Sequence, residues 1–579
     1  VCSSDLEVDR RLTRFEFEAW LENNYQKLDD QGQKIGPVTT GELDRCMHRG
    51  YPADKVVLDM MREIHRYFEF PKQNKMAVGL GGGHSGFTVA VLHLMNTESG
   101  FNVFVDTPRP ESESAKHGGA FRQSWGVQLI ELQKYAENGD ESRIHFNSRE
   151  GHIPSADELQ KLGIKLFVGV GHETTGATTY AEEDVRNLLE WIDLDPVNHH
   201  AVIDATSTLG AMPWAEDIVQ QVVGKCSLFM PFQKAIGGTA GYFIVSFTPE
   251  ALALVEKNVN NPAWAIPRQL KLALPADGQQ PISGKKSLAA GPFYDPAKEQ
   301  MIGGIINTFS TIAFAETTFG LLNSEKKVGS VRELNKRSIV NRAEVEQWVA
   351  DHPLFALGVE DSSRRGAAVT LLKVNDADVN DPEQHARIIA KTKQLLGFEG
   401  LTHPNGDYEH GLDVARYVNT FPGTAGDFRL WIGGIRPVSD ISAVFDNLEY
   451  AYLRAKIVVL EEELAKDGVT FEASAAADAS VRQDDPNRAY KVLIADLVGL
   501  KFDLDGNPDF SQLQSYIAEK GGVFHAGPAA AEDNLETGKI HFFYQPDLSR
   551  ADEILPQTAQ GQYDALIAAA TFFSKRSCL

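Results

Sequence analysis

A lysine and an aspartate in this chain each follow an apolar run of the kind that forms a buried strand. Asp204 ends HAVID, and Lys234 follows SLFMPF after one intervening residue, Gln233. Gly237 and Gly238 follow the lysine, and glycine permits the tight turn that would hold its amine in place. A lysine amine kept from bulk water can bond to a carbonyl carbon, and a carboxylate can pair with a protonated ring nitrogen. Pyridoxal phosphate (PLP) requires both groups, so the pair is a candidate PLP site.

A glycine-rich stretch, LGGGHSG, follows another apolar run, MAVGL. Gly81, Gly83 and Gly86 have the spacing of a dinucleotide-binding turn, and the later run NVFV ends in Asp106. In such a turn the glycines let the backbone approach a pyrophosphate, and the acid binds a ribose. An anion-binding turn at a helix N-terminus needs only small residues and free N–H groups. The stretch therefore predicts a phosphate site, of a dinucleotide or of another ligand.

Two further polar residues follow apolar runs. Arg436 ends FRLWIGGIR, where a guanidinium could bind a carboxylate through two parallel hydrogen bonds. His172, in GVGHETTGA, has no partner at metal-ligand spacing, so we predict a plain polar role and no metal site. Each candidate also has an ordinary explanation, because Lys234 fits a surface turn, Asp204 a strand end and Arg436 a solvated position. HExxH, GxSxG and Walker A motifs are missing from the sequence.

The order of apolar runs indicates the elements that must position these residues. From residue 76 to 250, short apolar runs alternate with helical stretches such as AEEDVRNLLEWI, which predicts an α/β fold with a mainly parallel sheet. Residues 299–350 read as mainly helical. We expect a lead-in at 1–35, a PLP-binding large domain at 36–330, a smaller α+β domain at 331–465, a linker at 466–488 and an extra C-terminal α/β segment at 489–579. Residues 1–6 resemble a translated sequencing adapter.

Composition narrows the classes of partner. The formal net charge is -24, from 80 acidic and 56 basic residues, which disfavours nucleic acid and anionic membranes. The four cysteines, Cys2, Cys46, Cys226 and Cys578, form no CxxC pair and no disulfide-like framework, as expected in a reducing compartment. No apolar run is long enough to span a bilayer. We therefore expect a cytoplasmic protein with small-molecule substrates.

Seven segments, taken in order, resemble those of the phosphoserine aminotransferases, which are class V aminotransferases of PLP fold type I. They lie between about residues 45 and 465 and read MHRGYPADKVVLDMMREIHRYF, GGGHSGFTVAVLHLM, HETTGA, VIDATST, FQKAIGGTAGYFIV, IINTFSTIAFAETTFGLL and GGIR. The resemblance implies fold type I and a transaminase that uses PLP. It implies that the Gly81–Gly86 turn binds the phosphate of PLP.

The resemblance also implies roles for individual residues. Lys234 would bind PLP covalently and move a proton as general base, Asp204 would pair with the pyridinium nitrogen, and Thr174 would lie beside the ring hydroxyl. The cofactor phosphate would be bound by Gly83, His84 and Gln233, and from the neighbouring subunit by Asn307 and Thr308. A phosphate site built from two subunits implies a homodimer with shared active sites.

Two arginines would recognise the substrates. Arg436 would bind the α-carboxylate, and Arg49 would face a distal phosphate or the side-chain carboxylate of glutamate. The implied reaction moves an amino group between glutamate and 3-phosphohydroxypyruvate, a step of serine biosynthesis. The chain departs from the family in two places: Pro110 stands where a tryptophan stacks on the cofactor, and Arg429 is one residue out of register with a phosphate-binding pair.

Other interpretations stay open. The chain could be a class V aminotransferase of alanine–glyoxylate or serine–pyruvate type, an NAD-dependent oxidoreductase using Gly81–Gly86 and Asp106, or a non-catalytic dimeric scaffold. The tail, from YKVLIADL to YDALIAAATF, resembles the start of D-3-phosphoglycerate dehydrogenases. An unrelated accessory α/β domain explains the tail equally well.

Overall fold

The structure, a computed structural model, consists of two compact units. It describes residues 10–29, 31–45, 51–96, 100–109, 143–149, 151–259, 309–396 and 426–466, with short stretches between 261 and 305 and at 418–419, 523–526 and 541–544. The first unit comprises Val1–Asn375 and Asn419–Val438, and the second comprises Asp376–Val418 and Ser439–Leu579. The domain boundaries expected at residues 330 and 465 stay a prediction.

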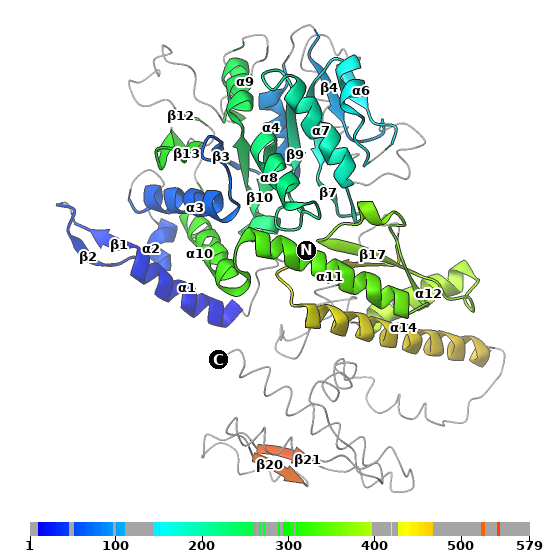
Figure 1. The fold of residues 1–579 in the computed structure, drawn as a ribbon. Helices are drawn as coiled ribbons and strands as arrows, with labels where there is room; N and C mark the ends of the chain where they lie inside the picture. Colours follow the sequence, from blue (N-terminus) through cyan, green and yellow to red (C-terminus); the bar gives the residue numbers. More distant parts are fainter. Residues whose placement is uncertain are drawn as a thin grey trace. The chain divides into compact units, whose positions relative to one another are not determined.

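A nine-stranded sheet forms the centre of the first unit (Figure 1), in the order β14-β13-β3-β11-β10-β9-β6-β4-β5. β11 and β13 pair antiparallel with their neighbours, while β10, β9, β6, β4 and β5 pair in parallel. The prediction of an α/β fold with a mainly parallel sheet is therefore confirmed. The strands are β3 (Lys75–Leu80), β4 (Asn102–Val105), β5 (Ile144–Phe146), β6 (Ile164–Val170), β9 (His200–Asp204), β10 (Ser227–Pro231), β11 (Tyr242–Phe247), β13 (Phe293–Asp295) and β14 (Gln300–Ile302).

Both faces of this sheet are covered by helices, which explains why its strands read as continuous apolar runs. Leu228 and Met230 of β10 lie in one buried cluster, and Phe229 between them lies in another. Because successive side chains point to opposite faces, the two clusters are the two layers of the core. The first layer includes α3 (Ala53–Tyr67), α7 (Glu182–Leu194), α8 (Glu216–Lys225) and α10 (Thr311–Val328), and the second includes α4 (Gly83–Leu94) and α9 (Pro249–Val259).

A smaller antiparallel sheet in the first unit contains β16 (Phe355–Leu357), β17 (Val369–Val374) and β19 (Phe428–Trp431). The long helix α11 (Val331–Asp351) precedes it and contacts β16. Ser330 caps α11 by accepting a hydrogen bond from the N–H of Glu333. The N-terminal part of the unit is formed by α1 (Arg10–Asn24), the hairpin of β1 (Gln26–Leu28) and β2 (Lys34–Pro37), and α2 (Thr40–Arg45).

The second unit contains α12 (Pro382–Leu395) and most of α14 (Val438–Lys466). Ion pairs join the two helices, because Arg387 contacts both Glu462 at 3.0 Å and Glu463 at 2.6 Å. The tail contributes one described parallel pair, β20 (Val523–Ala526) and β21 (His541–Tyr544). Its resemblance to a dehydrogenase lies mostly outside the described residues.

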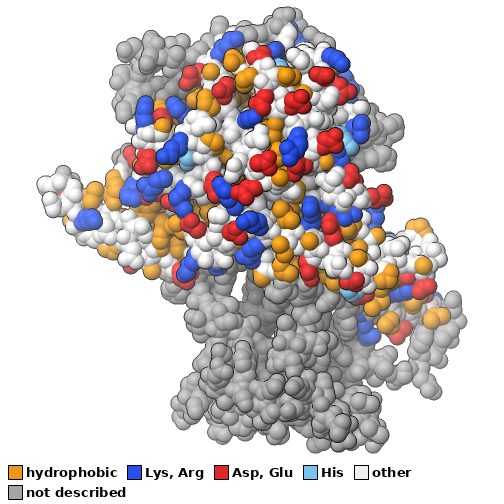
Figure 2. All heavy atoms as spheres, viewed as in Figure 1, with side chains coloured by type: hydrophobic (Ala, Val, Ile, Leu, Met, Phe, Trp, Pro, Cys, Tyr) orange, Lys and Arg blue, Asp and Glu red, His pale blue; other side chains and the backbone are white. Residues whose placement is uncertain are grey.

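The surface and the composition of the helices add two findings. On the face drawn in Figure 2, acidic and basic side chains are interspersed rather than gathered by sign. Among the described residues, no helix is both long and apolar enough to cross a membrane. The same part of the chain holds no cluster of three or more His, Cys, Asp or Glu side chains that could bind a metal ion.

Candidate functional site

The strand order brings the predicted residues to one edge of the large sheet. Strands β3, β10, β9 and β6 run in the same direction, so the loops that follow them leave from the same edge. These loops begin with Gly81, Phe232, Ala205 and Gly171 in that spatial order. The antiparallel β11 lies between β3 and β10, and its loop joins the edge because the carbonyl of Gly241 accepts a hydrogen bond from Gly81 N–H at 2.8 Å.

Lys234 lies in a single wide helical turn, η4 (Phe232–Ile236), directly after the fully buried strand β10. Its backbone leaves the helical region, with φ −126° and ψ −105°. Gly237 then closes the turn at φ 74°, a left-handed conformation that favours glycine, and its N–H donates to Lys234 O at 2.8 Å. A Cβ on Gly238 would lie 2.3 Å from Thr317 Oγ1. Backbone conformation thus favours glycine at 237, and the close approach of the Thr317 side chain favours it at 238.

Asp204 is the second member of the pair and is 5% exposed at the end of β9. Its Oδ1 accepts hydrogen bonds from the hydroxyl of Thr206 and from Thr206 N–H at 3.0 Å. Burial raises the pKa of Asp204, while the Thr206 bonds and the positive charge of Lys234 act to lower it and the charge of Glu173 to raise it. The structure therefore places Asp204 within electrostatic reach of Lys234 in a buried environment.

The N-terminus of α4 provides a candidate anion site near the lysine. Gly82 caps the helix, and a Cβ added to Gly82 or Gly83 would meet no atom within 4 Å. The first N–H groups of a helix lack partners within the helix and carry partial positive charge, so this open end suits a phosphate. Partial burial and the positive charge of Lys234 lower the pKa of His84, so that imidazole lies within electrostatic reach of the lysine.

Gln233 has a buried amide oxygen that accepts no hydrogen bond from any described residue. A buried polar atom without a partner is costly, and a ligand would supply one. Together with Gly83, His84, Asp204 and Lys234, Gln233 forms what we term the cofactor side. The donor set fits PLP, because it combines an amine, a buried carboxylate and an open helix N-terminus.

Thr174 follows β7 (His172–Glu173) and is 2% exposed. Its carbonyl accepts a hydrogen bond from Nη1 of Arg429 at 3.2 Å. The guanidinium carbon of Arg429 also lies 5.7 Å from the ring centroid of Trp431. Arg429 is thus a buried side chain that links β19 to the loop after β6.

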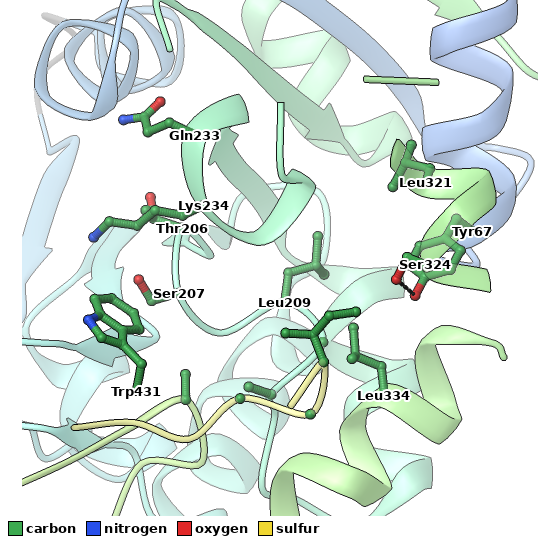
Figure 3. A pocket seen from close by; sticks show the side chains of 16 residues that line it. Tyr67, Thr206, Ser207, Leu209, Gln233, Lys234, Leu321, Ser324, Leu334 and Trp431 are labelled. Atoms are coloured by element: carbon green, nitrogen blue, oxygen red, sulfur yellow. Dashed lines mark hydrogen bonds between the residues drawn. The ribbon is translucent and has the colours of Figure 1, made fainter. Parts of the chain in front are cut away.

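A pocket with an empty volume of about 740 Å³, its mouth included, opens beside Lys234 (Figure 3). Thr206, Ser207, Gln233 and Lys234 lie together on one side of the view. What we term the apolar wall consists of Leu209, Ala211, Leu321, Leu334, Ala368, Trp431 and Ile435, which also line the pocket. The sequence analysis did not predict that Ser207 and Trp431 line this pocket. Ser207 lies in the segment VIDATST and Trp431 in FRLWIGGIR, but no pattern in either segment indicates a pocket.

Of the predicted site residues, Gln233 and Lys234 line this pocket, whereas Gly83, His84, Thr174, Asp204 and Arg436 are described but are not among its lining residues. Arg436 lies in the turn after β19, where its N–H donates to Gly433 O at 3.0 Å, and it is not among the described lining residues. Arg49, Asn307 and Thr308 lie outside the described residues. Their expected roles stay predictions.

The dinucleotide interpretation of Gly81–Gly86 with Asp106 is wrong. Four strands, β11, β10, β9 and β6, separate β3 from β4, whereas a dinucleotide fold requires the acid on a strand next to the glycine turn. The Asp106 carboxylate instead accepts hydrogen bonds from Asn147 Nδ2 at 2.9 Å, Gly151 N–H at 3.0 Å and Tyr180 OH at 2.7 Å. Asp106 is therefore a structural acid, and the oxidoreductase alternative loses its ribose ligand.

His172, for which we predicted a plain polar role, is 4% exposed. A Cβ on Gly366 would lie 1.8 Å from its Cε1. The imidazole thus packs directly against the backbone that leads into β17.

Comparisons with known proteins found similar structures. No family model matches the chain, and no curated protein matches it by sequence. A phosphoserine aminotransferase from Cytophaga hutchinsonii is 12% identical with a TM-score of 0.47, over 72% of this chain and 92% of the other. A ureidoglycine–glyoxylate aminotransferase from Bacillus subtilis is 13% identical with a TM-score of 0.46, over 75% and 95%. An alanine–glyoxylate aminotransferase from Nostoc sp. is 13% identical with a TM-score of 0.46, over 76% and 96%. At this level of identity and TM-score, the likeness assigns no function to the chain.

Proposed function

We propose that this chain is a PLP-dependent aminotransferase whose cofactor is held by Lys234. The observation that carries the proposal is the meeting of Lys234 and the buried Asp204 at one sheet edge, where the charge of Lys234 acts on the pKa of Asp204. The open N-terminus of α4 and the unpartnered amide oxygen of Gln233 supply a place for the cofactor phosphate. A transaminase requires these three functions in one site.

Each group would have a distinct part in the chemistry. Bound PLP supplies an electron sink that stabilises negative charge at the substrate Cα. Asp204 would hold a proton on the ring nitrogen, which is the charge state that draws electrons from Cα. Lys234 Nζ, once released from the cofactor, would take the Cα proton and return it one carbon away. The neutral state favoured for His84 avoids a second cation beside this amine.

The family resemblance extends the proposal to particular substrates. It implies transfer between glutamate and 3-phosphohydroxypyruvate, with Arg436 on the α-carboxylate and Arg49 on the distal anion. It also implies a homodimer in which Asn307 and Thr308 of each subunit complete the phosphate site of the other. The alternative is a class V aminotransferase of alanine–glyoxylate or serine–pyruvate type. The substrates of such an enzyme have small neutral side chains, so it would not need Arg49 to bind a distal anion.

Covalent labelling tests the central claim. Purified protein mixed with PLP should turn yellow, and borohydride should attach the cofactor to the peptide that contains Lys234, as read by mass spectrometry. Lys234→Ala should lose the label. Lys225→Ala is the matched control, because Lys225 lies at the end of α8 and pairs with Asp193 at 2.6 Å. A colourless protein that binds NADH, or label on another lysine, would refute the proposal.

A further inference from the structure

The residues that line the pocket beside Lys234 favour apolar substrate side chains over anionic ones. Of its described lining residues, Lys234 is the one with a charged side chain; the remainder are the apolar wall, small glycines and neutral polar groups. A side-chain phosphate placed against the apolar wall would lose water and find no cation other than Lys234 among the described lining residues, which is unfavourable. An apolar side chain would instead replace water and gain favourable burial.

The polar groups of the pocket sit at its two ends. At the end away from Lys234, Tyr67 OH and Ser324 Oγ are 2.9 Å apart and satisfy one another, so they require nothing from a ligand. At the end near the lysine, Ser207 is 8% exposed and its hydroxyl has no hydrogen-bond partner among the described residues. Figure 3 shows Ser207 on the same side of the pocket as Lys234 and Trp431. The pocket therefore favours a substrate with a polar group near Lys234 Nζ, where it can bond to Ser207, and an apolar group farther from the lysine.

The lining of the pocket suits a bulky apolar side chain. The wall includes an indole ring and three leucines, which offer dispersion contacts to a branched or aromatic group. The guanidinium of Arg429 lies over the indole ring of Trp431.

We propose that one of the two substrates of this chain is a neutral amino acid with a bulky apolar side chain, of leucine or phenylalanine type, and its 2-oxo acid. The side chain would occupy the pocket between the apolar wall and Ser207. The inference rests on the proposed aminotransferase function. It places such an amino acid where the family resemblance implies phosphoserine, and it leaves the second substrate open.

Half-reactions test the selectivity. PLP-loaded protein is mixed with L-leucine, L-phenylalanine or O-phospho-L-serine, and the loss of the yellow chromophore is followed. We expect the apparent second-order rate constant with leucine or phenylalanine to exceed that with phosphoserine at least tenfold. A phosphoserine rate tenfold above both would overturn the inference while leaving the aminotransferase assignment intact.

A second measurement does not depend on the loaded enzyme. Titration of cofactor-free protein with 4-methyl-2-oxopentanoate in a calorimeter should show saturable binding, and 3-phosphohydroxypyruvate should bind at least tenfold more weakly. Saturable binding of the phosphorylated acid alone would overturn the pocket assignment. If the protein takes up no PLP, the proposed function fails, and this titration still decides whether the pocket selects apolar ligands.

Placing a cation in the wall sharpens both tests. Leu334→Arg should weaken binding of 4-methyl-2-oxopentanoate at least tenfold and strengthen binding of the phosphorylated acid. The matched control is Val340→Arg on the same helix, since Val340 is 51% exposed and does not line the pocket. Leu334→Gln is the milder variant if the arginine disturbs folding. Equal effects of Leu334→Gln and Val340→Arg on ligand binding would contradict the assignment.

Discussion

The cofactor side and the apolar wall are built by different means, although Gln233 and Lys234 of the cofactor side line the same pocket as the wall. The cofactor side consists of loops that leave the carboxyl edge of one sheet, and each loop is held by its own local turn. Gly237 N–H returns to Lys234 O at 2.8 Å, and Thr206 N–H returns to Asp204 at 3.0 Å. The parallel pairing of β9 with β10 then suffices to bring Lys234 and Asp204 together.

The apolar wall has no such local basis, because its members come from the loop after β9, from the helices α10 and α11, and from the smaller sheet and the turns beside it. Long-range bonds tie that sheet to the loops of the large one. Arg364 pairs with the buried Asp184 at 2.7 Å, Gly366 N–H donates to Ala177 O at 3.0 Å, and Arg429 donates to Thr174 O at 3.2 Å. We therefore expect the proposed chemistry to depend on single residues of the cofactor side, and the shape of the pocket to depend on contacts between segments far apart in the sequence.

The largest effect should come from Lys234. Lys234→Ala should lower kcat of transamination by roughly a thousandfold or more, because it removes both the nucleophile and the proton carrier. The melting temperature should change little. Steady-state kinetics with a mixed panel of amino acids measures the first, and thermal unfolding the second. Turnover within tenfold of the wild type would place the chemistry elsewhere.

The two aspartates of the sheet edge should respond differently to the same change. Asp204→Asn should lower kcat by about a hundredfold or more with little loss of stability, because burial already disfavours the charge there. Asp106→Asn should instead cost about 1–3 kcal/mol of unfolding free energy, because it weakens acceptors for three donors. Kinetics and urea unfolding on both variants test this contrast. A catalytic loss with Asp106→Asn at unchanged stability would contradict it.

The folding stability of the chain should fall in acid because of a buried histidine, His93, in the last turn of α4. Burial lowers the pKa of His93 to about 4, and this ring bonds Val89 O at 2.7 Å through Nδ1 and accepts Leu272 N–H at 2.8 Å through Nε2. Protonation would remove that acceptor. The unfolded chain binds a proton at this histidine below about pH 6.5, whereas the folded chain does so only near pH 4. The contribution of His93 to the free energy of unfolding should therefore be fully present above about pH 6.5 and fall by up to about 3 kcal/mol as the pH decreases to about 4.

Unfolding free energies measured across this pH range give the slope. His93→Gln should remove a corresponding part of it, whereas His385→Gln, on the separate helix α12, should leave it. An unchanged slope in His93→Gln would show that other groups cause the acid sensitivity.

The contact between the two sheets should give the smallest effect on chemistry. Arg364→Ala leaves the buried Asp184 without its cation and should cost about 2–3 kcal/mol of unfolding free energy. The ion pair ties the smaller sheet, which carries part of the apolar wall, to the large sheet. Its loss should therefore raise KM severalfold and leave kcat nearly unchanged. Arg186→Ala, which breaks an exposed pair with Glu182, is the control and should cost about 0.3–0.5 kcal/mol. A fall in kcat without a change in KM would contradict a role in shaping the wall.

The sequence by itself determined the sheet and the chemical pair. Continuous apolar runs such as HAVID and SLFMPF can be buried on two faces, and Asp204 and Lys234 lie at or just after their ends, where strands pass into the loops that carry functional side chains. Gly237 was also readable, since the left-handed turn after Lys234 favours glycine.

Tertiary structure alone decided which ends of strands became neighbours. Asp106 and Asp204 both close apolar runs, but the strand order separates the first from the glycine turn and brings the second to the lysine. It also turned Arg429 to the Thr174 carbonyl and placed Trp431 in the pocket. The physical reason is that pairing and packing between segments far apart in sequence depend on the total burial of the folded chain, which no local pattern encodes.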